Sequence, residues 1–349
     1  MREPYSPSKT ARWIVGPLVF VLLLAVAWSA FWYFAAQKSE QVIAAWIARE
    51  AQLGRTYDCR SRTVGGYPFR IEVNCEEPTA TIRDPNVAVS IKAENLVAVA
   101  QVYQPDLIIA EVTGPMTVVE SESGVTFDAD WKLLQASLRG PPDRPERLSL
   151  AADGVKLVRA GGASEPSPLL QAAHLEFHVR HAIGYSADVP VFELAMRAHD
   201  ALVPTLTQWV NGPLNIDGLA TLSGVSDFKV KPLPQRLREW QAANGRLLLT
   251  SLRVQQGNAV GVAKGDVGLN ASGKPDGSFD ITVAGFDQVL QGLLGGKGQG
   301  LQAGLMAGLS LLGPQTELEG KRAVKLPLRF QDGNVLLGPV RIAQIAPLF

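Results

Sequence analysis

The segment IVGPLVFVLLLAVAWSAFWYFAA, residues 14–36, decides how the rest of the chain is placed, because it contains no charged residue. As a helix it is long enough to span the hydrocarbon core of a bilayer, which needs about 20 apolar residues. A helix also pairs its own backbone polar groups, which lipid cannot do. Trp28, Trp32 and Tyr33 near its end are typical of an aromatic belt at a membrane surface. We therefore predict a transmembrane anchor over residues 14–36.

The charges on either side of this segment orient it in a membrane. Arg2, Lys9 and Arg12 precede it and are opposed only by Glu3, whereas the residues that follow carry no excess of basic side chains. Positively charged flanks stay on the cytoplasmic side of a membrane. We therefore expect residues 1–13 to form a cytoplasmic tail and the body of the protein to lie on the other side.

A cleaved signal peptide is the alternative to an anchor. Residues 25–27, Ala-Val-Ala, have the small side chains of a cleavage site. The apolar run continues past Ala27 to Ala36, however, and it exceeds the usual signal core of about 7–15 residues. The length of the run favours an uncleaved anchor.

Residues 37–54 predict a helical stalk that continues the anchor. In EQVIAAWIAREAQL, residues 40–53, apolar side chains recur at helical spacing. Gly54 follows, and glycine commonly ends a helix. The remaining residues, 55–349, would form the body.

The only two cysteines, Cys59 and Cys75, lie within YDCRSRTVGGYPFRIEVNC, residues 57–75. The sequence has the form of two strands joined at Gly65-Gly66, with the cysteines at comparable distances from the turn. Because an exported compartment is oxidising, we predict a disulfide between them, which stabilises by about 3 kcal/mol in the chain-entropy model. Two buried free thiols are the alternative. Zinc is not expected, because no histidine lies near the cysteines.

The body reads as a series of antiparallel strands. Alternating apolar and polar side chains, which indicate a sheet covered on one face, recur in residues 175–179, 192–198, 278–284 and 322–330. Residues 94–102 are apolar on both faces and should therefore lie deeper. The predicted fold class is α+β, predominantly antiparallel β, as a curled or extended sheet with a few packed helices, preceded by one N-terminal transmembrane helix.

Three short helices are predicted among the strands. PQRLREWQAA, residues 234–243, ends before an Asn-Gly pair that is typical of a helix stop. Residues 286–294 and 301–312 flank the glycine-rich sequence GGKGQG. From Gly300 onward a glycine occurs at every fourth position as far as Gly308. This stripe suits close packing on the sheet or, alternatively, contact with lipid.

Composition and motifs argue against several classes of function. The 33 basic and 33 acidic residues balance, which disfavours a nucleic-acid partner, and a hydrophobic fraction of 46% disfavours a disordered chain. The sequence contains no nucleophile elbow, phosphate-binding loop or zinc-protease motif. A metal site would need its ligands on one strand face, which is not expected of the four histidines, His174, His178, His181 and His199. We therefore expect no enzyme activity, no metal and no cofactor.

Three features together resemble a known bacterial family. They are an anchor that ends in aromatic residues, a helical stalk, and the motif Gly66-Tyr67-Pro68-Phe69-Arg70 between the two cysteines. The strand FDADW, residues 127–131, follows downstream. The chain thus resembles the exported bacterial proteins that carry the domain of unknown function 2125, over most of its length after the anchor. This resemblance implies a single-pass protein of the inner (cytoplasmic) membrane with its bulk in the periplasm, and it implies no particular reaction.

The C-terminal third is similar to the tail of AsmA-type proteins, in residues 245–286 and 325–348. That resemblance implies an N-terminal anchor followed by a long curled sheet with an apolar trough. It also implies a part in phospholipid movement or in outer-membrane homeostasis. The present chain is too short to bridge an envelope alone.

Together these inferences predict a membrane-anchored periplasmic protein of the cell envelope that holds a lipid or another hydrophobic ligand in a curled sheet. Its first partner would be the lipid bilayer of the inner membrane. An envelope scaffold or assembly factor that binds protein partners, without a ligand cavity, is the alternative, since apolar faces normally pack on each other. An exported hydrolase with a site assembled from distant residues is a further alternative.

Overall fold

The computed structural model describes residues 9–84, 87–121, 123–140, 145–161, 165–182, 190–204, 212–227, 231–285 and 314–349. Within these residues the chain forms two helices and 21 strands, and the strands join a single hydrogen-bonded sheet. The sheet is antiparallel throughout and is not closed. The predicted class, mainly antiparallel β behind a long N-terminal helix, is confirmed.

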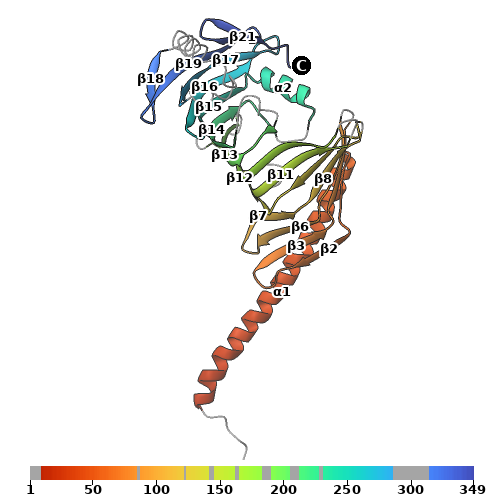
Figure 1. The fold of residues 1–349 in the computed structure, drawn as a ribbon. Helices are drawn as coiled ribbons and strands as arrows, with labels where there is room; N and C mark the ends of the chain where they lie inside the picture. The colour runs from red at the N-terminus through yellow and green to blue at the C-terminus, as the bar shows by residue number, and fades with distance from the viewer. Residues whose placement is uncertain are drawn as a thin grey trace, which may run out of the picture.

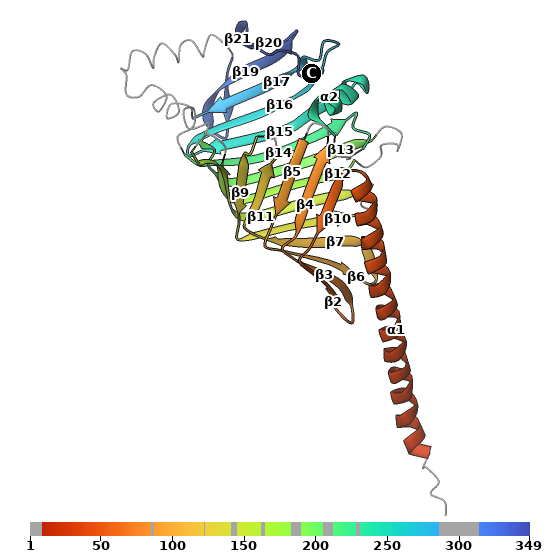
Figure 2. The ribbon, with the colours of Figure 1, turned by 90° about the vertical axis from the view of Figure 1, so that its right-hand side faces the viewer.

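Helix α1, Lys9–Gln52, is a single rod of 44 residues, so the segments predicted as anchor and stalk belong to one helix. Its apolar part is long enough to cross a membrane and contacts little else in the molecule. The helix ends just before Gly54, whose φ of +76° is readily adopted by glycine and ends the helical path. In Figures 1 and 2 the first half of α1 projects away from the body, and its second half lies along the sheet.

The sheet divides at the long strand β11, Arg147–Ala160. One edge of β11 pairs with a single strand, whereas the other edge pairs with two strands in succession. Two branches of five strands therefore start from β11. The first branch runs through β10 (Leu133–Arg139), β7 (Gln104–Thr113), β6 (Asn95–Gln101), β3 (Arg70–Glu76) and β2 (Ser61–Gly65). The second branch runs through β9 (Thr126–Asp130), β8 (Met116–Glu120), β5 (Val87–Lys92), β4 (Thr79–Asp84) and β1 (Arg55–Asp58).

From the other edge of β11 the sheet continues without branching. The order is β12 (Ser167–His181), β13 (Val191–Ala201), β14 (Leu214–Ser223), β15 (Arg246–Gln256), β16 (Ala259–Leu269), β17 (Pro275–Ala284) and β19 (Lys321–Gln331). The far edge of β19 pairs with β18 (Gln315–Leu318) and β20 (Asn334–Leu337), and β20 pairs with β21 (Val340–Gln344). Helix α2, Leu233–Ala242, lies between β14 and β15 in sequence and confirms the helix predicted there.

The cross-strand register separates the sheet into an apolar inner face and a polar outer face. From β10 to β15, successive partners on the inner face are Ala136, Leu150, Phe177, Met196, Gly218 and Leu252. The sequence neighbours of these residues pair with one another on the outer face; they are Gln135, Ala151, Glu176, Arg197, Asp217 and Arg253. The four segments predicted to alternate lie in β12, β13, β17 and β19, so the period-two pattern identified strands correctly.

Most buried apolar residues in the described structure are alanine or valine, and Phe192 is the largest exception. One cluster consists of Ala172, Ala198, Ala201 and Leu214 on the strands that follow β11. Residues 94–102 were expected to lie deep, but no residue of β6 is fully buried. The reason is that one face of β6 lines an open cavity and the other faces outward. The helices predicted at residues 286–294 and 301–312, with their glycine stripe, lie outside the described residues.

Candidate functional site

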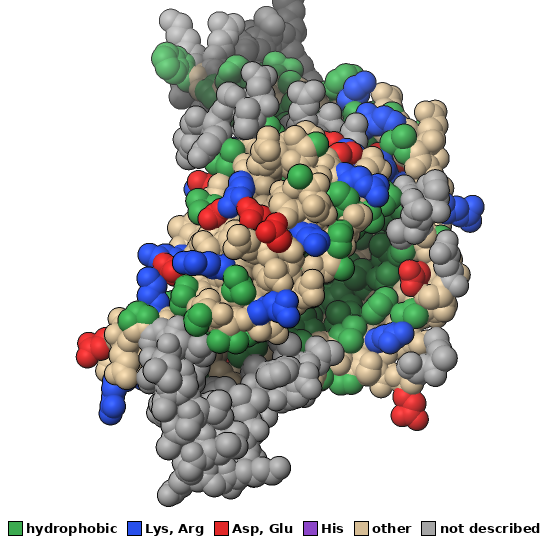
Figure 3. All heavy atoms as spheres, turned by 90° about the horizontal axis from the view of Figure 1, so that it is seen from above, with side chains coloured by type: hydrophobic (Ala, Val, Ile, Leu, Met, Phe, Trp, Pro, Cys, Tyr) green, Lys and Arg blue, Asp and Glu red, His purple; other side chains and the backbone are tan. Residues whose placement is uncertain are grey.

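The middle of the inner face is an apolar surface that is open to its surroundings. Leu148, Leu150, Phe177 and Met196 lie on three neighbouring strands, and each is between 38% and 45% exposed. Large exposed apolar side chains that adjoin one another are typical of a binding surface. Figure 3 shows hydrophobic side chains gathered in a hollow of the molecule. The inner face is therefore the first part of the candidate site.

The second part is a cavity of about 880 Å³ between the two branches and helix α1. The first branch contributes Val73, Cys75, Leu96 and Val112 to its wall. The second branch contributes Tyr57, Ala80, Ile91 and Met116. Helix α1 supplies the remaining wall through Ile43, Ala44, Trp46, Ile47 and Ala48. We call this space the helix-capped cavity.

Packing between α1 and β1 holds the helix over the cavity. Trp46 stacks on Tyr57 with ring centroids 4.8 Å apart, and Glu50 forms an ion pair with Arg55 at 2.5 Å. Burial raises the pKa of the Tyr57 phenol, and the neighbouring Glu50 carboxylate raises it further, so this wall of the cavity is a poorly solvated environment. Of the apolar residues that predicted a stalk helix, Ile43, Trp46 and Ile47 thus face the sheet, whereas Val42 and Leu53 are exposed.

The described lining of the helix-capped cavity carries charge only at Asp58 and Arg62. The Asp58 carboxylate accepts a hydrogen bond from the backbone N–H of Cys59 at 2.9 Å. Arg62 lies opposite Cys75 in the β2–β3 pair and hence on the inner face. An apolar wall with a cation at one side suits an elongated ligand that has a hydrocarbon part and a polar end.

The predicted disulfide between Cys59 and Cys75 is confirmed, with the two Cα atoms 5.4 Å apart, and the alternative of two free thiols is wrong. Cys59 directly follows β1 of the second branch, whereas Cys75 lies in β3 of the first. The bond therefore joins the two branches beside the helix-capped cavity. Cys75 is only 5% exposed, so the bond forms part of the wall.

Motif residues 66–69 form the turn between β2 and β3, Arg70 begins β3, and this turn lies against α1. The indole nitrogen of Trp28 donates a hydrogen bond to the Pro68 carbonyl at 2.9 Å, and that of Trp32 donates to the Arg70 carbonyl at 2.9 Å. The hydroxyl groups of Ser29 and Tyr67 lie 2.8 Å apart. The motif and the aromatic end of the anchor thus form one contact. Sequence reasoning noted both parts but missed their contact, since neither part specifies its partner.

Glycine is required at the first position of the motif. Gly66 has a φ of +97°, and a Cβ atom there would lie 2.7 Å from the carbonyl oxygen of Arg70. The backbone N–H of Arg70 donates a hydrogen bond to the Gly66 carbonyl at 3.2 Å, which closes the turn. A larger residue would open the turn and move Tyr67 and Pro68 away from α1.

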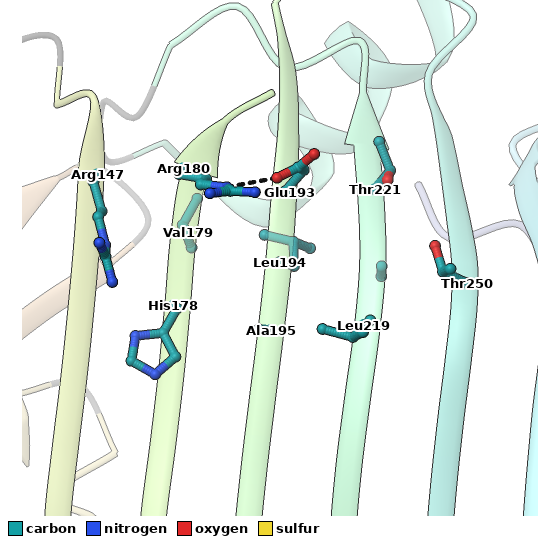
Figure 4. Close-up of a pocket in the computed structure, with 11 residues that line it drawn as sticks. Arg147, His178, Val179, Arg180, Glu193, Leu194, Ala195, Leu219, Thr221 and Thr250 are labelled. Atoms are coloured by element: carbon teal, nitrogen blue, oxygen red, sulfur yellow. Dashed lines mark hydrogen bonds and ion pairs between the residues drawn. The ribbon is translucent and has the colours of Figure 1, made fainter. Parts of the chain in front are cut away.

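The outer face carries a polar groove of about 450 Å³ across β11–β15, shown in Figure 4. Arg180 and Glu193 form an ion pair there at 2.5 Å, with Arg147 and Thr221 beside them. Charged and hydroxyl side chains line this groove together with apolar residues such as Leu219, whereas the helix-capped cavity is larger and its described lining contains only two charged side chains. The groove is therefore the weaker candidate for a hydrophobic ligand.

Three of the four histidines, His174, His178 and His199, lie on this polar outer face, whereas His181 lies on the opposite face beside Phe192. His174 lies between two carboxylates, with Nδ1 2.6 Å from Asp153 and Nε2 2.9 Å from Glu176. Hydrogen bonds to Asp153 and then to Glu176 raise the pKa of His174 above its ordinary value. In the part of the chain that the structure describes, no three His, Cys, Asp or Glu residues are arranged to hold a metal ion.

These features define a class of protein: an open antiparallel sheet with an apolar inner face, attached to an apolar N-terminal helix that is compatible with membrane anchoring. The chain belongs to the family described as "uncharacterized protein conserved in bacteria (DUF2125)", whose model matches residues 32–346. The first of the two resemblances is thereby confirmed, whereas the similarity to AsmA-type proteins stays a prediction. No curated protein matches the chain.

Proposed function

We propose that this protein is a membrane-anchored component of the bacterial cell envelope that binds a lipid, or another ligand with a long hydrocarbon chain, on the inner face of its sheet. One observation carries the proposal: the apolar surface is continuous from the cavity to the open part of the sheet. Val112 of the cavity wall lies on the same face as Ala110. From Ala110, cross-strand partners lead through Ala136 and Leu150 to Phe177.

The size and chemistry of this surface support the proposal. A volume of about 880 Å³ falls in the range of roughly 300–1,000 Å³ that is typical of ligand pockets. Each buried methylene contributes about 0.8 kcal/mol, so a stretch of roughly ten methylenes would contribute about 8 kcal/mol before the cost of association. A hydrocarbon chain therefore needs only a moderate length of the inner face.

The proposed location follows from the helix and the disulfide. Helix α1 would span the inner membrane through residues 14–36, with residues 1–13 in the cytoplasm and the sheet in the periplasm. The Cys59–Cys75 bond supports this orientation, because disulfides persist mainly in oxidising compartments. The proposed role is binding, without catalysis and without a cofactor.

Site-specific photocrosslinking in the full-length protein tests the proposal. The photoreactive residue p-benzoylphenylalanine replaces Phe177 on the inner face, or Met116 in the cavity wall. In the matched controls it replaces the next residue along each strand, His178 or Thr117, on the opposite face. After irradiation in membranes, mass spectrometry of the purified protein should find lipid adducts at the two inner positions and far fewer at the two outer positions.

The same experiment separates the alternatives. Equal lipid labelling on both faces, or none on either, would rule out a ligand held on the inner face. A defined protein adduct at Phe177 or Met116, without lipid, would instead support the envelope scaffold. Circular dichroism and an intact disulfide check that each variant has folded.

A further inference from the structure

A group of exposed aromatic side chains lies at the end of the body from which the free half of α1 projects. Tyr67 and Phe69 in the β2–β3 turn are 57% and 61% exposed, and Tyr103 in the β6–β7 turn is 67% exposed. The backbone N–H of Val102 donates a hydrogen bond to the Phe69 carbonyl at 3.0 Å, so the two turns are adjacent. We call Tyr67, Phe69 and Tyr103 the aromatic tip.

The aromatic tip lies against the C-terminal part of the apolar segment of α1, through Tyr67 and Phe69. The rings of Trp32 and Tyr67 meet edge to face at 5.4 Å, and those of Trp28 and Phe69 lie 6.2 Å apart. Together with the hydrogen bonds from Trp28 and Trp32, these contacts fix the height of the tip along the helix. Figures 1 and 2 show the strands β2, β3 and β6 at this end of the body.

The length of α1 below the aromatic tip can be compared with the thickness of a membrane. From Arg12 to Trp32 the helix rises by about 30 Å at roughly 1.5 Å per residue, which equals the thickness of the hydrocarbon core. A membrane crossed from Arg12 onward would therefore have its far surface near Trp32. Tyrosine and tryptophan are enriched at this depth because an aromatic ring can sit among lipids while its polar group contacts water or headgroups.

We infer that the aromatic tip inserts into the surface of the same bilayer that α1 spans, on the side of the body. This inference rests on the proposed anchor, and it adds a second membrane contact made by the sheet itself. The partner is a lipid surface, because Phe69 contacts Trp28, Trp28 contacts the exposed Phe31 with ring centroids 5.6 Å apart, and Phe34 on the same helix is also exposed. The guanidinium of Arg70, next to Phe69, forms an ion pair with Glu72 at 2.8 Å but is 58% exposed, so it would also be accessible to lipid phosphates.

Two attachment points would hold the body in a defined position above the membrane. The cavity wall on α1 begins at Ile43, about 16 Å further along the helix than Trp32. A lipid that leaves the bilayer beside the aromatic tip would therefore need to move about 16 Å along α1 to reach the cavity. The proposed ligand would reach the helix-capped cavity from the membrane surface.

Fluorescence quenching in the full-length protein tests this inference. In Tyr103→Cys the new thiol is labelled with the polarity-sensitive dye NBD, and the native cysteines do not react because they are bonded to each other. The protein is reconstituted into vesicles of phosphatidylethanolamine and phosphatidylglycerol that contain lipid with a nitroxide near the headgroup. We expect blue-shifted emission and quenching several-fold stronger than in the control Asn258→Cys, an exposed site in the β15–β16 turn. Phe69→Cys should behave like Tyr103→Cys.

Alkaline extraction of the same membranes reports separately on the anchor. If the protein stays in the pellet but the labels at positions 69 and 103 are quenched no more than the label at 258, the inserted tip is wrong and the anchor stands. If the protein is extracted, the anchor and the tip both fail. Far-UV circular dichroism and the unreduced Cys59–Cys75 bond show that each variant keeps its fold.

Discussion

Trp28 donates a hydrogen bond from its indole nitrogen to the carbonyl oxygen of Pro68 over 2.9 Å. One helical turn further on, Trp32 does the same for Arg70. These two bonds connect the apolar part of α1 to the turn of a hairpin far along the chain. The indole groups thereby fix the body to the helix at one height, through donors that would otherwise be satisfied by water or headgroups.

The double substitution Trp28→Phe and Trp32→Phe tests this connection, because phenylalanine keeps an aromatic ring but has no donor. Loss of both bonds should cost about 1–3 kcal/mol. Hydrogen exchange of the backbone amides of residues 66, 67, 69 and 70, measured in detergent micelles, should become roughly 5–150-fold faster, since each 1.4 kcal/mol is about tenfold. Trp13→Phe is the control, since Trp13 is 84% exposed and remote from the turn. Unchanged exchange in the double variant would show that the turn is held by its own strands alone.

The disulfide gives a second prediction. Cys59→Ser should lower the free energy of unfolding by about 3 kcal/mol, because the bond closes a loop with a sequence separation of 16. Chemical denaturation with and without reducing agent measures the effect. Reduction should destabilise the wild type and leave Cys59→Ser unchanged. Maleimide should label one thiol in the unfolded variant and none in the unfolded, unreduced wild type. A labelled wild type would contradict the bond.

Much of the sheet could be predicted because its signals are local. The alternation of Leu175, Phe177 and Val179 with polar neighbours identified β12, and the pair Asp332-Gly333 falls between β19 and β20 as expected of a hairpin turn. The disulfide was predictable for the same reason, since both cysteines lie on one short hairpin segment. These features depend on residues that are close in sequence.

The fork at β11 could not be predicted, because it depends on pairings between distant residues. Asp153 pairs with Leu133 of the first branch, whereas Lys156 pairs with Asp130 of the second. Gly154, with a φ of +63°, lies between them at the point where the partner changes. An isolated glycine in a strand suggests an irregularity but does not identify the partners. The helix-capped cavity lies between the two branches of this fork, so it could not be predicted from the sequence either.

A large side chain introduced into the helix-capped cavity should block ligand binding. Ala44→Trp places an indole into the cavity from the α1 wall, while Ala45→Trp places the same group on exposed helix surface outside the lining. We expect lipid crosslinking from position 116 to fall several-fold in Ala44→Trp and to stay at the wild-type level in Ala45→Trp. Equal adduct yields in the two variants would mean that the lipid does not occupy this cavity.

The polar network on the outer face predicts a pH dependence of stability. The carboxylates of Asp153 and Glu176 raise the pKa of His174, so the folded state favours its charged form. Hydrogen bonding to His174 in turn lowers the pKa of Glu176, which therefore stays charged in the neutral range. A group whose pKa is raised on folding contributes stability below its unfolded pKa, about 6.5 for histidine, and loses that contribution as pH rises through the folded pKa.

His174→Gln should therefore be less stable than the wild type near about pH 6, and the difference should shrink as the pH rises through the raised pKa of His174 and the wild-type ring becomes neutral. Chemical denaturation at a series of pH values above about 5 measures this, since the carboxylates stay charged there. His181→Gln is the control, because the ring of His181 packs against Phe192 instead of lying between two acids. A difference for His174→Gln that grew with rising pH would have the wrong sign for a protonated ring held by carboxylates, and it would show that neutral His174 contributes the stability.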